Sequence, residues 1–100
     1  MKILIRPRGM TLTKKQCVRL ERQLDLALAR FGERIDRVIV ELSHLGGDGF
    51  KCCEIEVRLK AQIVRVEDTD TDVFLAMEHA ANRVARSVSR AIEVEGLVRR

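Results

Sequence analysis

Four stretches of the chain carry the pattern of hydrophobic and polar positions that is typical of β-strands. Residues 2–6 form a short apolar run, and residues 36–45, 51–60 and 63–67 alternate apolar with polar side chains at a period of two. The glycine-rich stretch 46–49 predicts a hairpin turn between the second and third strands. Because only one side of each alternating strand is apolar, the sheet should be buried on one face and solvent-exposed on the other.

Two longer stretches repeat their apolar residues at helical spacing. The first covers residues 13–31, where Thr13 and Gln16 have the spacing of a capping box and Gly32 marks the end. The second follows the acidic segment 67–72. Its apolar stripe comprises Phe74, Met77, Ala81, Val84, Val88 and Ile92.

The order of these elements, β-α-β-β-β-α, predicts an α+β fold. Each helix has one apolar stripe, so we expect a four-stranded, mostly antiparallel sheet with both helices packed on one face. A chain of 100 residues is long enough for one hydrophobic core and too short for two. We therefore expect a single domain over residues 1–95 and a frayed tail over residues 96–100.

The composition favours a polyanionic partner in a reducing compartment. The net charge is +4, and with three Phe and neither Tyr nor Trp the chain lacks aromatic platforms for stacking single-stranded bases. Three cysteines, an odd number, fit a reducing cytosol better than a disulfide framework. No segment resembles a signal peptide or a membrane span, so we expect a cytoplasmic protein that does not act at a membrane.

The most specific candidate for binding is a row of basic side chains on the second helix. At 100° per residue, His79, Arg83, Arg86 and Arg90 fall on one side, roughly opposite the apolar stripe. No acid lies within residues 79–92, so none of these side chains has a carboxylate partner four residues away. If the helices lie side by side, the row merges with a looser basic set on the first helix. That set comprises Lys15, Arg19, Arg22 and Arg30, with Arg8 near the first turn.

Such a basic surface suits a phosphate backbone, because the forked guanidinium group can bind two phosphate oxygens at once. A solvated helix face that binds nothing is the alternative, since exposed helix faces commonly carry Arg and Lys.

The acidic segment before the second helix has the spacing of a calcium loop but not its other requirements. Asp68, Asp70 and Asp72 alternate as calcium ligands do, yet the loop needs Gly where this chain has Val73 and Glu where it has His79. Capping of the helix and compensation of its dipole explain these acids better.

The adjacent cysteines do not form a recognisable zinc site. Cys52 and Cys53 point to opposite faces of a strand, so both cannot bind one ion with His44 without distortion. We expect Cys53 in the core and Cys52 facing outward. The two histidines lie on separate elements, away from any nucleophile motif. We therefore expect no metal, no cofactor, no small-molecule substrate and no catalysis.

The second helix also carries a motif that resembles a known family. The matching positions are Asp72, Phe74, Ala76, Arg83, Val84, Ala85, Arg86, Ser87, Val88 and Arg90. The start of the first helix at Thr13 and its end at Arg30 and Phe31 are similar too. To about Ala91, the chain resembles the short ribosome hibernation promoting factors, also called ribosomal subunit interface proteins or sigma-factor modulation proteins.

The resemblance implies a fold like that of double-stranded-RNA-binding domains and a role on the ribosome. The protein would dock on rRNA of the small subunit near the decoding region, overlap the positions of messenger and transfer RNA, and hold ribosomes inactive during stress or stationary phase. The basic residues of both helices would contact rRNA phosphates. A second hypothesis is a small protein-interaction module that has kept the fold and lost ribosome binding. It is favoured by Val18 and Leu26, which the helical pattern leaves exposed, and by the acidic tail.

Overall fold

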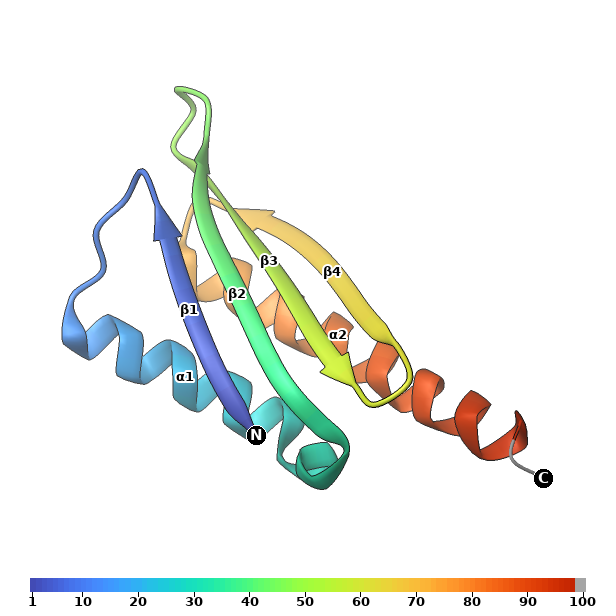
Figure 1. Cartoon of the computed structure of the whole chain (residues 1–100). Coiled ribbons are helices and arrows are strands. Elements are labelled where there is room, and N and C mark those ends of the chain that lie inside the picture. The colour runs from blue at the N-terminus through green and yellow to red at the C-terminus, as the bar shows by residue number, and fades with distance from the viewer. Residues whose placement is uncertain (99–100) are drawn as a thin grey trace.

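The computed structural model describes residues 1–98 and contains a four-stranded sheet and two long helices (Figure 1). In chain order, the elements are β1 (Lys2–Arg8), α1 (Lys14–Leu28), the 3-10 helix η1 (Ala29–Arg34), β2 (Ile35–Leu45), β3 (Phe50–Leu59), β4 (Ile63–Asp70) and α2 (Val73–Val98).

The strands lie in the order β1-β2-β3-β4, so each strand neighbours the next one in the sequence. β1 runs parallel to β2, because α1 carries the chain back between them, and the other two pairs are antiparallel. Both helices cover the same face of the sheet, with α2 behind β3 and β4 (Figure 1). The predicted α+β fold, with its mostly antiparallel sheet and one helical layer, is confirmed.

The hydrophobic core lies between the sheet and the helices. Leu20, Leu24 and Leu28 of α1 are completely buried, which is why this helix repeats leucine every four residues. The core residues from α2 and the sheet include Met77, Ala80, Val84, Val88, Val38, Val40, Leu42, Cys53, Ile55 and Val57. Each large side chain buried in this way stabilises the fold by about 1.5–3 kcal/mol.

Both helices begin at the residues that the sequence predicts. The Thr13 hydroxyl accepts a hydrogen bond from the Gln16 amide at 3.1 Å, and the Gln16 side chain accepts one from the Thr13 amide at 2.8 Å. At α2, the Asp72 carboxylate accepts hydrogen bonds from the amides of Phe74 at 2.8 Å and Leu75 at 3.4 Å. The acids before α2 therefore include a helix cap, as expected.

Three details differ from the sequence prediction. α1 ends at Leu28 and the chain continues as a 3-10 helix through Gly32, so this glycine does not end the helical segment. β1 extends past Pro7, which an edge strand tolerates because it has an unpaired side. Cys52 lies on the outer face of the sheet as predicted, but its side chain is buried rather than exposed.

The predicted frayed tail lies partly outside the described residues, since α2 runs to Val98 and residues 99–100 are not described. The division into a domain over residues 1–95 and a tail over residues 96–100 remains a prediction. Within residues 1–98, no helix is long and apolar enough to cross a membrane.

Candidate nucleic-acid interface

The basic row of α2 lies on the side of the helix that faces away from the core. His79, Arg86 and Arg90 are exposed, whereas Val84 and Val88 between them are completely buried. Because residues three or four apart lie on the same side of a helix, burial of one stripe forces the other stripe into solvent. Within residues 1–98, Arg86 and Arg90 take part in no ion pair.

Arg83 differs from the rest of this row, because strand β4 holds its side chain. Its Nη1 donates a hydrogen bond to the main-chain oxygen of Glu67 and lies 3.5 Å from the carboxylate of Asp68. The sequence shows no acid near Arg83 on the helix, but the fold brings one from the neighbouring strand. Arg83 therefore joins α2 to the edge of the sheet.

The basic residues of α1 lie on the other side of a shallow groove. Lys15 and Arg22 are exposed, and the Arg19 guanidinium lies 3.8 Å from the centre of the Phe74 ring of α2. This cation–π contact, together with a hydrogen bond of 3.4 Å from the Gln23 amide to the Phe74 carbonyl, joins the two helices. The helices do lie side by side, as the merging of the two basic sets requires.

The groove between the helices has a volume of about 400 Å³ and separates the two basic sets. It is lined by Gln23, Leu26, Ala27, Glu78, Ala81 and Asn82. The groove is not apparent from the sequence. Its α2 residues Glu78 and Asn82 have i, i+4 spacing, which places them on one side of the helix but does not by itself indicate a groove.

Two of the predicted binding residues lie outside the two long helices. Arg30 is in η1, where its guanidinium lies 4.6 Å from the centre of the Phe31 ring. Arg8 is near the end of β1 on the outer face of the sheet, where it pairs with Glu41 at 3.2 Å. Because the helices cover the opposite face of the sheet, Arg8 cannot share one flat surface with the basic row of α2.

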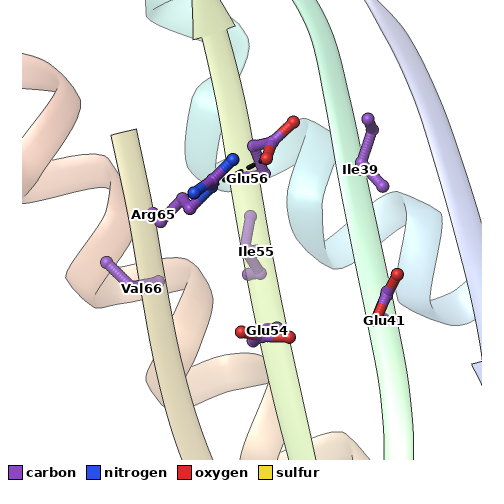
Figure 2. Close-up of a pocket in the computed structure, with 7 residues that line it drawn as sticks. All are labelled: Ile39, Glu41, Glu54, Ile55, Glu56, Arg65 and Val66. Carbon is purple, nitrogen blue, oxygen red and sulfur yellow. Dashed lines mark hydrogen bonds and ion pairs between the residues drawn. The ribbon is translucent and has the colours of Figure 1, made fainter. Parts of the chain in front are cut away.

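The outer face of the sheet carries carboxylates at its centre. Glu41, Glu54 and Glu67 lie in register on β2, β3 and β4. Glu41 and Glu54 line a cavity of about 220 Å³ (Figure 2). In the same view, Arg65 turns toward Glu56, and these side chains pair at 2.8 Å. This central row would repel phosphate groups, so the sheet face is a poor candidate for a nucleic-acid surface.

The ion pairs of this face alter the ionisation of Glu56. Its carboxylate accepts one hydrogen bond from Arg58 and one from Arg65, each at 2.8 Å. These hydrogen bonds favour the charged form and hold the pKa of Glu56 below its ordinary value of 4.5.

The cysteine pair is arranged for burial, not for reactivity. Burial raises the pKa of the Cys53 thiol to about 12, and burial together with nearby Glu67 raises the pKa of Cys52 to about 11. Within residues 1–98, no three His, Cys, Asp or Glu side chains converge in a way that could hold a metal ion.

This architecture defines the class of the protein. It is a small α+β protein that has a basic helical layer and an acidic centre on the outer face of its sheet. The family model described as sigma 54 modulation protein / S30EA ribosomal protein matches residues 3–93, which is nearly the whole chain. The chain belongs to this family, a group of ribosome-associated hibernation and subunit-interface proteins. The resemblance inferred from the sequence is thus confirmed.

Two solved structures are similar to this chain. One is the N-terminal domain of Protein Y from Thermus thermophilus, with 30% identity, a TM-score of 0.68, and coverage of 89% of this chain and 93% of that one. The other is a ribosomal subunit interface protein from Coxiella burnetii, with 12% identity, a TM-score of 0.80, and coverage of 93% and 99%. At that lower identity, the second match shows the shared fold alone. No curated protein matches the chain.

Proposed function

We propose that the protein docks on rRNA of the small ribosomal subunit near the decoding region and inhibits translation. It would occupy positions that messenger and transfer RNA use, and so keep ribosomes inactive in the cytoplasm during stress or stationary phase. Membership of a ribosome-associated family supports this proposal. The action is steric occlusion by a bound protein, so it requires no catalytic group.

The observation that carries the proposal is the pair Arg86 and Arg90 on the outward side of α2. Both are exposed and neither forms an ion pair within residues 1–98, so their guanidinium groups are available to phosphate oxygens. His79, Lys15, Arg19, Arg22 and Arg30 would extend the contact along the helical layer. Arg83 would contribute mainly by holding α2 against β4, and Arg8 lies on the other side of the sheet.

Co-sedimentation with ribosomes across a salt series tests this function. Neutralising several phosphates releases counterions, so the affinity should fall by about tenfold or more between about 50 and 200 mM salt. The purified protein should migrate with small subunits and whole ribosomes at the lower salt concentration. Absence of the protein from both fractions would contradict the proposal.

The salt series also separates the second hypothesis, a protein-interaction module. Leu26 and Val18 are 77% and 53% exposed, which is the feature that favours a protein partner. A protein partner held by apolar side chains would stay bound at high salt and after nuclease treatment, whereas an rRNA contact would not.

A further inference from the structure

The groove between α1 and α2 has polar acceptors and apolar walls but is flanked by basic residues. Glu78 and Asn82 line it from α2, and the exposed side chain of Leu26 lines it from α1. The small side chains of Ala27 and Ala81 leave the space open. Its volume of about 400 Å³ falls within the range of small-ligand sites, roughly 300–1,000 Å³.

Basic side chains lie at both ends of this groove. Arg19 of α1 packs on Phe74 of α2, and each lies one helical turn before a groove residue, Gln23 and Glu78 respectively. Arg19 therefore closes this end of the groove. At the other end, Arg86 follows Asn82 by four residues, a rise of about 6 Å along α2. Another basic residue, Arg30, follows the groove residue Leu26 by four positions. A phosphate would therefore be attracted to either end, while the Glu78 carboxylate would repel it from the middle.

The middle of the groove offers hydrogen-bond acceptors instead. Glu78 is exposed, and its carboxylate provides two acceptor oxygens to a ligand in the groove. The Gln23 side-chain amide donates to the Phe74 carbonyl, and its Oε1 is buried, so this oxygen is not available to a ligand. A ligand that fits must present N–H donors between two phosphates and have a flat apolar surface for Leu26 and Ala27.

We propose that the groove binds one unstacked guanine of a single-stranded or looped RNA segment. Guanine alone among the four bases presents two adjacent donors, N1–H and N2–H, which match the two oxygens of a carboxylate. Adenine, cytosine and uracil place an acceptor beside their donor, which a carboxylate repels. The base would lie between the helices, with its flanking phosphates near Arg19 and Arg86.

This inference rests on the proposed RNA-binding function and names the chemistry that the same surface recognises. It also accounts for two features that phosphate binding alone leaves unexplained. One is an acid, Glu78, in the groove between the two basic sets, and the other is Leu26, which is 77% exposed on the helical layer.

Fluorescence anisotropy with labelled RNA decamers tests the proposal. The probes are a uridine decamer, the same decamer with one central guanine, and the same decamer with one central inosine, which lacks the 2-amino group. The protein should bind the guanine probe roughly fivefold or more tighter than the uridine probe, with inosine in between.

Glu78→Gln is the decisive variant. It should reduce the guanine preference to less than about twofold while leaving binding of the uridine decamer as tight or tighter, because it removes a negative charge. Glu93→Gln makes the same change on the exposed side of α2, outside the groove, and should retain the preference.

Leu26→Ser is a second variant, and it leaves the charge of the groove unchanged. Because Leu26 is mostly exposed, the fold should be unaffected while the affinity for the guanine probe falls. Equal binding of the guanine and uridine probes, or a preference that survives Glu78→Gln, would overturn the guanine site and leave the ribosome proposal standing. Failure to bind ribosomes and every decamer at low salt would overturn both.

Discussion

The outer face of the sheet and the outward face of the helices differ in the surroundings of their arginines. On the sheet, Arg8, Arg58 and Arg65 each pair with a glutamate on the same face. On the helices, Arg86 and Arg90 form no ion pair within residues 1–98. Both faces carry several arginines, so their number does not identify a binding surface. Three arginines of the sheet face have a carboxylate partner, but Arg37 on that face is exposed and outside every ion pair within residues 1–98, as Arg86 and Arg90 are. What separates the two faces is the row of carboxylates at the centre of the sheet.

Arg83 belongs to both patterns. It lies on the same helix as Arg86 and Arg90, yet it is bound to β4 through Glu67 and Asp68. Part of the basic row therefore stabilises the fold, and the rest is available for binding.

Substitutions on the buried and exposed sides of α1 should differ most in their effect on the free energy of unfolding. Leu24→Ala should lower the free energy of unfolding by about 2–5 kcal/mol, because Leu24 is completely buried and its removal leaves a cavity. Leu26→Ala, two positions away and 77% exposed, should change it by less than about 0.5 kcal/mol. Urea denaturation measures both, and similar losses would contradict the packing of this helix.

Substitutions of Arg83 and Arg86 should differ by a smaller amount in the free energy of unfolding. Arg83→Gln should lower the free energy of unfolding by about 1 kcal/mol, since it weakens a charged but half-exposed contact with β4. Arg86→Gln, the matched control on the same helix, should leave stability unchanged and weaken ribosome binding more than Arg83→Gln does. Equal effects of the two variants in both measurements would show that the row is uniform.

The smallest effect is a dependence of stability on pH at the sheet. The pKa of Glu56 is lowered in the folded state, so its ion pairs stabilise the protein fully above the unfolded value near 4.5. This contribution is lost as the pH falls below that value and through the lower folded pKa. Chemical denaturation should therefore show Glu56→Gln less stable than the parent at pH 7, with the difference shrinking as the pH is lowered below 4.5. A constant difference would contradict the role of these pairs.

The sequence was sufficient to predict the layers of this fold. Alternation in residues 36–45 and 51–60, and helical spacing around Leu20 and Leu24, depend only on which side of an element is buried. The end of α1 was harder, because the chain passes through Gly32 in a 3-10 helix whose ends depend on packing.

The candidate site was only partly predictable for a similar reason. A helical wheel places Arg86 and Arg90 in solvent correctly. It cannot show that Asp68, fifteen residues before Arg83, returns beside it on β4. Nor can it show the groove at Gln23 and Glu78, which exists only once the two helices lie side by side.

The proposed ribosome-binding surface is the helical face and not the sheet face. Ribosome co-sedimentation of two charge-reversed variants distinguishes the two faces. One variant is Arg86→Glu with Arg90→Glu on α2, and the other is Lys2→Glu with Arg37→Glu on the outer face of the sheet. All four side chains are exposed and outside every ion pair within residues 1–98, and the two variants change the net charge equally.

We predict that the α2 variant loses about 100-fold or more in ribosome affinity and has a shallower salt dependence, because it removes two phosphate contacts. The sheet variant should lose less than about threefold, because it alters only the net charge. Equal losses, or a larger loss in the sheet variant, would contradict the assignment of the ribosome-binding surface to the helices.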